Sequence, residues 1–275
     1  MKYGIAIRNM GPQSNRLAFR ACARSAEDAG FDALFVSDHL CIPPDQTEGS
    51  GGRYLDVLAA LAYLAGMTSR IRIGVSVLVL PYRPAVLTAK QIATIQELSD
   101  ERMILGVGVG WMKPEFDALG VEIRRRGALT SETLRVLQHL FGNREARRYE
   151  GKLVQFPPFV FEPHPKRPPI WVGGGSPKAR ERVVEFGDGW HPMQRAAELK
   201  PLVEDLRSRM RAAGKPEPEI VVRRALKLDD TGAARAKLDA EREAGATYYI
   251  LDLGRYPDER EFRRSAEIFI GKVAH

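Results

Sequence analysis

The chain contains only two cysteines, Cys22 and Cys41, and they do not form a CxxC pair. This scarcity is typical of a reducing compartment and excludes a disulfide-rich scaffold, so we expect a cytoplasmic location. No apolar run approaches the roughly 18 residues that span a bilayer, and the first residues enter a strand pattern without the arrangement of a signal peptide. We therefore expect no association with a membrane.

Several motifs of known catalytic and binding classes are also absent. The five histidines lack HExxH or comparable ligand spacing, no GxSxG elbow occurs, and neither cysteine has an evident base partner. The net charge is +7, but the basic residues are spread along the chain, with only short runs such as 124–126. We expect no metal site and no nucleic-acid partner, and a negatively charged cofactor or substrate better explains the basic surplus.

Length and periodicity favour a single α/β barrel. The 275 residues are 44% hydrophobic, which is enough for one large core. Short apolar runs alternate with helical patterns, and strands separated by helices pair in parallel. The sequence therefore predicts one (β/α)8 TIM barrel over residues 1–275, with strands at 2–8, 32–37, 70–80, 103–109, 170–173, 189–191, 220–228 and 247–253.

Two irregular stretches interrupt this barrel pattern. Residues 143–168 hold five prolines without clear periodicity, and are typical of an insertion before the fifth strand. Residues 40–53 follow the second strand and are rich in glycine and proline. Long loops of this kind are often functional, so we expect both stretches to lie at the carboxyl face of the barrel or to fold over it.

The segment PIWVGGGS at 169–176 predicts an anion site. A buried strand leads into three glycines, and Ser176 stands where the next helix begins. Unpaired N–H groups and the helix dipole at such a position favour an anion. A tight strand-to-helix turn without a ligand is the alternative. We predict that Gly174, Gly175 and Ser176 hold a phosphate group.

Candidate acid–base and aromatic residues follow other strands, at the barrel end where active sites lie. Asp38 and His39 come directly after the second strand, and a histidine near neutral pKa donates and accepts protons. The alternative is a structural aspartate beside a surface histidine. Glu115 either positions a ligand or caps a helix, and Trp111 and Trp190 either stack on a planar ring or pack in the core. Because the sequence shows no nucleophile for covalent catalysis, a redox cofactor best explains an anion site together with acid–base and aromatic residues.

The order and spacing of several short motifs resemble the luciferase-like monooxygenase superfamily of flavin and deazaflavin oxidoreductases. The resemblance covers nearly the whole chain, and its marks are EDAGFD at 27–32, SDH at 37–39, IGVSV at 73–77, GVGVGW at 106–111 with Glu115, and GDGW at 187–190. The short length and the DHL motif, followed by two prolines, are more similar to the branch that uses coenzyme F420, an 8-hydroxy-5-deazaflavin.

The resemblance implies a (β/α)8 barrel that binds F420 or FMN and transfers a hydride between the deazaflavin C5 and a small organic substrate. His39 then supplies or removes the accompanying proton. An FMN-dependent monooxygenase that uses reduced flavin and O2 is an alternative, and so is a non-catalytic flavin-binding protein. The surplus of basic residues favours F420, which has an acidic tail, and the presence of His39 argues against a non-catalytic protein. The resemblance also implies a tendency to form homodimers.

Individual residues take their expected roles from the same resemblance. It implies that Asp38 and His39 face the ring and the substrate, and that a phosphate lies on the glycine segment. The remaining ring contacts are Ser76 and Val77, in a bulge with a cis peptide bond behind the ring, and Val109 and Gly110 at its edge. The chain departs from the sugar-phosphate dehydrogenase relatives, which carry an acid and a tryptophan where Trp111 and Pro43 stand here. This departure argues against sugar-phosphate oxidation.

Overall fold

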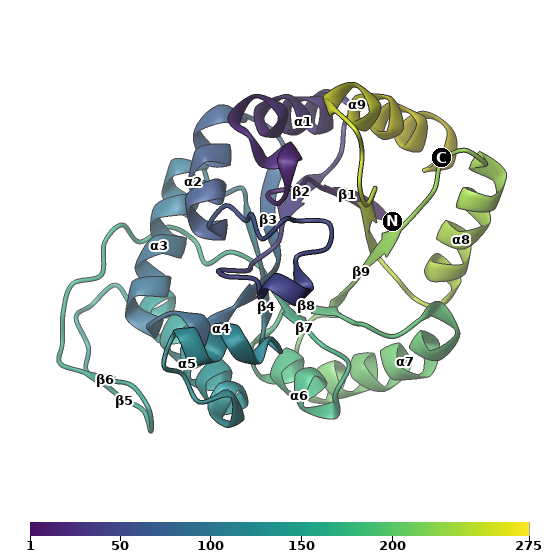
Figure 1. Cartoon of the computed structure of the whole chain (residues 1–275). Coiled ribbons are helices and arrows are strands. Elements are labelled where there is room, and N and C mark those ends of the chain that lie inside the picture. The colour runs from purple at the N-terminus through teal and green to yellow at the C-terminus, as the bar shows by residue number, and fades with distance from the viewer. Residues whose placement is uncertain (275) are drawn as a thin grey trace.

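Eight parallel strands close into a barrel in the computed structural model, which describes residues 1–274 (Figure 1). The order around the barrel is β1-β10-β9-β8-β7-β4-β3-β2. All eight predicted strands are present, with ends that shift by three residues or fewer. They are β1 (Lys2–Ala6), β2 (Ala33–Val36), β3 (Arg72–Val79), β4 (Met103–Gly108), β7 (Ile170–Gly173), β8 (Gly189–His191), β9 (Glu219–Ala225) and β10 (Tyr248–Asp252).

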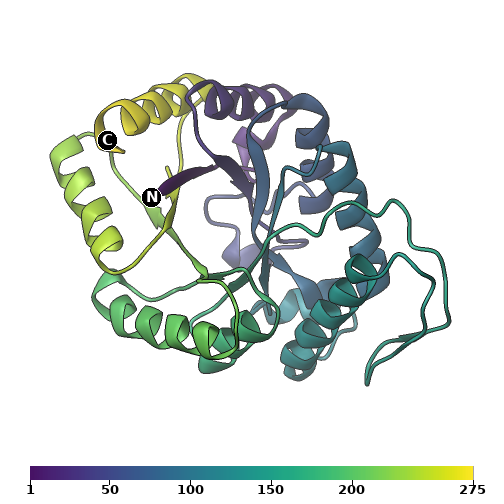
Figure 2. The same ribbon diagram turned by 180° about the vertical axis from the view of Figure 1, so that it is seen from behind.

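A helix follows each strand and packs on the outside of the barrel, as parallel pairing requires. The ring of helices is visible from both ends (Figures 1 and 2). It consists of α1 (Arg16–Asp28), α2 (Val57–Met67), α3 (Ala85–Leu98), α5 (Arg126–Gly142), α6 (Pro177–Phe186), α7 (Ala196–Ala212), α8 (Thr231–Glu243) and α9 (Glu259–Ile268), with the short α4 (Lys113–Ala118) between β4 and α5. The predicted (β/α)8 barrel is therefore confirmed.

Side-chain caps fix where several of these helices begin. The Asn15 side chain accepts hydrogen bonds from the first amides of α1. Asp56 does the same for α2, and the Ser176 hydroxyl for α6. Such caps each contribute about 1 kcal/mol. They fix the starts of α2 and α6, which lie at the carboxyl end of the barrel.

Aromatic side chains fill the barrel interior. Phe35, Trp171 and Tyr248 are fully buried, and the Phe35 ring centroid lies 5.5 Å from that of Trp171 and 6.1 Å from that of Tyr248. These residues belong to a cluster inside the barrel, separate from the larger core between strands and helices. The filled interior explains why the large cavity described below lies at the strand ends instead of passing through the barrel.

The proline-rich stretch 143–168 lies along the outer wall of the barrel. It carries a small hairpin of β5 (Tyr149–Glu150) and β6 (Gln155–Phe156), which lies outside α3 and α5 (Figure 1). The Lys166 carbonyl accepts a hydrogen bond from Gln96 of α3, and Tyr149 donates one to Glu132 of α5. Because this stretch connects the end of a helix to the start of β7, it leaves from the end opposite the carboxyl face. The stretch is a connecting excursion along the outer wall, and residues 153–155 of its hairpin lie in a pocket with Pro81, Arg83 and Pro84, which follow the carboxyl end of β3. Residues 40–53 follow the carboxyl end of β2 directly.

No helix within residues 1–274 combines the length and the apolar character needed to cross a bilayer.

Candidate active site

A cavity of about 640 Å³ opens at the carboxyl ends of the strands. This volume is in the usual range for small-molecule and cofactor sites. The cavity brings together most of the residues predicted from the sequence. Those in its lining are Asp38, His39, Ser76, Val77, Val109, Gly110 and Gly174, whereas Gly175 and Ser176 lie outside it.

The floor of the cavity contains a bulge in β3. The register of β3 against β4 shifts there, and the Ser76–Val77 peptide bond is cis, which confirms the expectation from the resemblance. A Cβ at Gly108 of β4 would lie 2.6 Å from Val77 Cγ2, and one at Gly173 of β7 would lie 3.2 Å from Val77 Cγ1. These two glycines therefore make room for the Val77 side chain, which forms an apolar surface over the neighbouring strands.

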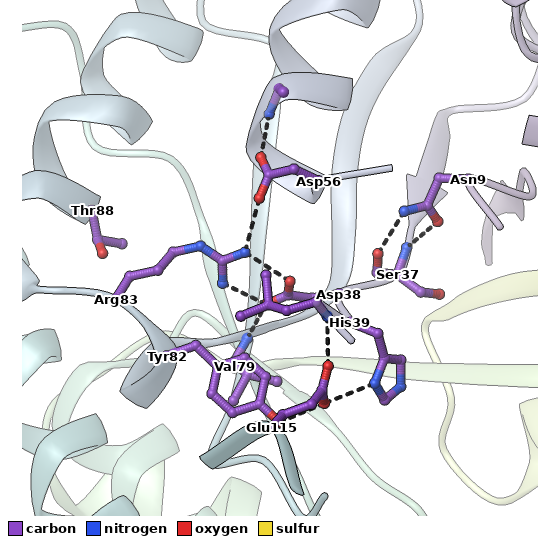
Figure 3. A network of polar contacts seen from close by, with 12 residues as sticks. Asn9, Ser37, Asp38, His39, Asp56, Val79, Tyr82, Arg83, Thr88 and Glu115 are labelled. Atoms are coloured by element: carbon purple, nitrogen blue, oxygen red, sulfur yellow. Dashed lines mark hydrogen bonds and ion pairs between the residues drawn. The ribbon is translucent and has the colours of Figure 1, made fainter. Parts of the chain in front are cut away.

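His39 is held by a carboxylate from the short helix α4. Its Nδ1 lies 3.0 Å from Oε2 of Glu115 in α4 (Figure 3). A carboxylate only accepts hydrogen bonds, so Nδ1 carries the hydrogen. In the neutral imidazole, Nε2 is then the unprotonated nitrogen and accepts a proton. This arrangement gives His39 the form that a general base needs.

Glu115 is fully buried and collects four hydrogen bonds. Its Oε1 accepts from the amides of Leu40 and Cys41, and its Oε2 accepts from His39 and from the Tyr82 hydroxyl at 2.8 Å. Burial acts to raise the pKa of Glu115, but these hydrogen bonds and the charge of His39 outweigh it and lower that pKa. Glu115 is therefore an ionised positioning group, and the alternative of a helix cap does not hold.

The Asp38 carboxylate is fully engaged by protein donors. Both carboxylate oxygens accept from the Arg83 guanidinium, at 2.7 and 2.8 Å, and Oδ2 also accepts from the Val79 amide (Figure 3). The Asp38 side chain has no exposed surface. Asp38 also lies in the cavity lining, and its contact with the ring stays a prediction. Through these hydrogen bonds it anchors β2 to the loop after β3 and so fixes the position of His39.

A second histidine, His191 at the end of β8, lies across the cavity and was not among the predicted site residues. Its Nε2 lies 2.8 Å from the Ser76 hydroxyl. Burial, followed by the charges of Arg223 and Arg224, lowers the pKa of His191 to about 3. His191 is thus neutral at working pH, and it fixes the Ser76 hydroxyl without carrying charge.

Two arginines on β9 complete the polar lining. Arg223 pairs with Asp252 and donates to Ser37 Oγ and to the Ser76 carbonyl. Arg224 pairs with Glu241 outside the cavity. Neither arginine is among the site residues predicted from the sequence, although two consecutive arginines near the carboxyl end of a predicted barrel strand are a signal for such a site.

The predicted phosphate segment forms the turn between β7 and α6. Gly174 has a φ of 115°, and its N–H donates to the His191 carbonyl, so that group is already paired. The Ser176 hydroxyl caps α6. The N–H groups of Gly175 and Ser176 take part in none of the hydrogen bonds within residues 1–274. Two donors at a helix N-terminus therefore remain for an anion.

The two tryptophans that were candidates for ring stacking, Trp111 and Trp190, have different positions. Trp190 is fully buried and donates to the Gly174 carbonyl, so it belongs to the core. Trp111 is 68% exposed in the cavity lining, and its ring centroid lies 6.2 Å from that of His39. Trp111 is thus the tryptophan that is open to a ligand.

The sequence model of the luciferase-like monooxygenase family matches residues 3–269. The chain belongs to this family. Two relatives show the cofactors found in it. The chain is 29% identical over 268 residues to an F420-dependent glucose-6-phosphate dehydrogenase of Kineococcus radiotolerans, covering 90% of this chain and 77% of the relative. It is 29% identical over 199 residues to an FMNH2-dependent dimethylsulfone monooxygenase of Pseudomonas fluorescens, covering 70% and 52%.

A solved structure of the same fold is the monooxygenase RslO1 from Streptomyces bottropensis. It superposes with a TM-score of 0.86 at 19% identity and covers 100% of this chain and 99% of that one. Members of the luciferase-like family are F420- or FMN-dependent oxidoreductases and monooxygenases, so the chain is an enzyme of this kind with a deazaflavin or flavin cofactor.

Proposed function

We propose that this protein is an F420-dependent oxidoreductase that moves a hydride between the deazaflavin and a small organic substrate, with His39 as the proton carrier. The observation that carries the proposal is the pairing of His39, in the lining of the large cavity, with the buried Glu115 behind it. A hydride transfer to or from a carbon–oxygen group needs one proton moved in parallel, and this pair provides one site for it.

The residues present fit a cofactor of this kind. The Val77 side chain offers an apolar surface on the cavity floor, suited to a flat ring. The free amides of Gly175 and Ser176 at the start of α6 suit a phosphate. When bound, a deazaflavin accepts or donates a hydride.

The protein side of the reaction follows from the hydrogen bonds of His39. In the oxidation of an alcohol, the hydride leaves the carbon, the hydroxyl proton passes to Nε2 of His39, and a carbonyl remains. Glu115 keeps Nδ1 protonated and stabilises the charge that the ring then carries. In the reverse direction, the same nitrogen returns the proton to the carbonyl oxygen.

One feature supports F420 over FMN. The net charge of +7 attracts the acidic tail of F420 more strongly than the single phosphate of FMN.

The test is a titration of the cofactor-free protein with F420 and with FMN, followed by fluorescence at low and at high salt. We expect F420 to bind more tightly, with an advantage that shrinks as the Debye length falls from roughly 10 Å at 0.1 M to 3 Å at 1 M. The deazaflavin without phosphate and tail is the matched control for the ring. Tighter binding of FMN, with oxygen consumed when the bound flavin is reduced, would instead establish the monooxygenase.

A further inference from the structure

The mouth of the cavity is apolar and aromatic around the proton carrier. The His39 ring lies between Tyr54 and Trp111, with ring centroids 5.1 and 6.2 Å away and both contacts edge-on. Met193 lies in the same lining and is 80% exposed. Exposed apolar side chains that line a cavity are typical of surfaces that a ligand covers. A substrate that reaches Nε2 of His39 therefore meets apolar surface on its way.

The cations of the cavity are already neutralised. Arg223 lies 2.8 Å from a carboxylate oxygen of Asp252, and Arg224 lies 2.6 Å from one of Glu241. Arg83, which holds Asp38, is likewise paired. Every arginine that lines the cavity within residues 1–274 thus has a carboxylate partner. A phosphate or carboxylate on the substrate would find no free cation there, and an unpaired charge in such a site is costly.

Nor does a histidine supply the missing charge. His191 stays neutral because burial and the two neighbouring arginines oppose its protonation. Its Nε2 and the Ser76 hydroxyl are paired with each other. His39 faces the buried carboxylate of Glu115, so a proton gained at Nε2 makes a pair with Glu115 and does not create a free positive charge. The polar groups are therefore suited to move one proton and not to bind an anion.

We propose that the substrate is an uncharged, largely apolar ketone or alcohol whose body lies against Trp111, with its reacting oxygen at Nε2 of His39. The inference rests on the proposed function and names its substrate class. Trp111 acts in it as a specificity-determining residue, because an aromatic face binds an apolar ring and offers nothing to a carboxylate.

The experiment uses a matched pair of probes, 4-methylcyclohexanone and 4-oxocyclohexane-1-carboxylate, which share the ring and the ketone and differ in charge. Calorimetric titration into the F420-loaded protein is expected to give at least tenfold tighter binding of the neutral ketone. Trp111→Ala should weaken that binding about tenfold, and Trp111→Phe should largely retain it. Leu87→Ala, which removes a 52% exposed side chain of α3 outside the cavity, is the control and should change nothing.

The outcomes separate this inference from the proposed function. F420 binding is measured first by fluorescence. If F420 does not bind, the proposed function is contradicted, and the two probes are titrated into FMN-loaded protein instead. With either cofactor bound, equal or tighter binding of the carboxylate would overturn the neutral-substrate inference. So would a failure of the neutral ketone to bind at 10 mM, or binding that Trp111→Ala leaves unchanged.

Discussion

Replacement of Glu115 by glutamine tests how the site controls its proton. The two amides of Leu40 and Cys41 only donate, so the carboxamide oxygen of the introduced glutamine must stay on them, where Oε1 is now. The NH2 group then takes the place of Oε2, beside His39 Nδ1 and the Tyr82 hydroxyl. Because that NH2 donates, His39 Nδ1 must become the acceptor, and the ring hydrogen moves to Nε2.

The expected loss follows from this exchange of tautomers. With Nε2 protonated, His39 no longer accepts the substrate proton, and general acid–base groups contribute about 10²- to 10⁴-fold. We therefore expect Glu115→Gln to slow hydride transfer by a factor in this range, close to that of His39→Ala. Binding of F420 should change little, because neither side chain holds the cofactor phosphate in the proposed arrangement.

The assay is stopped-flow absorbance at the deazaflavin band, in single turnover with an alcohol substrate, together with ¹⁵N NMR of His39 to identify the protonated nitrogen. Tyr82→Phe is the matched control, since it removes one donor to the same oxygen but leaves the His39–Glu115 contact in place. A folded Glu115→Gln protein that reacts within about threefold of the native rate would refute the reasoning, and so would an unchanged tautomer of His39.

Three further predictions concern packing, pH and the buried ion pair. Gly108→Ala places a Cβ 2.6 Å from Val77 Cγ2 and should lower the free energy of unfolding by roughly 1–3 kcal/mol. Val77→Ala should recover this loss in the double variant. Urea titration of the native protein, the two single variants and the double variant checks this, and effects that simply add would contradict it. The pKa of His191 is about 3 in the folded protein and about 6.5 in the unfolded chain, so acidification to pH 4 protonates this residue in the unfolded chain alone. The free energy of unfolding should therefore fall by about 3 kcal/mol between pH 6.5 and 4. His191→Gln should remove this loss from the measured curve of stability against pH. Asp38→Asn removes the buried partner of Arg83 and leaves it only the longer contact, at 3.3 Å, with the half-exposed Asp56. It should destabilise the protein by roughly 3 kcal/mol in thermal or urea unfolding, whereas a change below about 1 kcal/mol would show that the pair is dispensable.

Local sequence patterns were sufficient for the barrel because each strand carries its own signal. The run Ala33–Val36 is apolar and fully buried, as parallel strands between two layers are. The glycine turn before Ser176 likewise has its signal in adjacent residues. These features depend on neighbours in the chain, and a sequence displays neighbours directly.

Side-chain partners that meet only in the folded barrel were not predictable in the same way. Glu115 lies 76 positions from His39, and Arg83 lies 45 positions from Asp38. The residues around each of these four positions do not indicate which side chains pair in the folded protein. The sequence placed Asp38 at the correct strand end, but its direction depends on an arginine from the next loop.

The hairpin of β5 and β6 has a practical consequence. Its Tyr149 hydroxyl donates to Glu132 of α5, on the outer wall of the barrel, and none of the hairpin residues lines the cavity at the mouth. Residues 145–147, which are exposed and precede β5, are therefore a place where an epitope or a second protein is graftable without disturbing the reaction. An enzyme fused there to a cofactor-recycling partner would keep its mouth unobstructed, with the two catalysts tethered side by side.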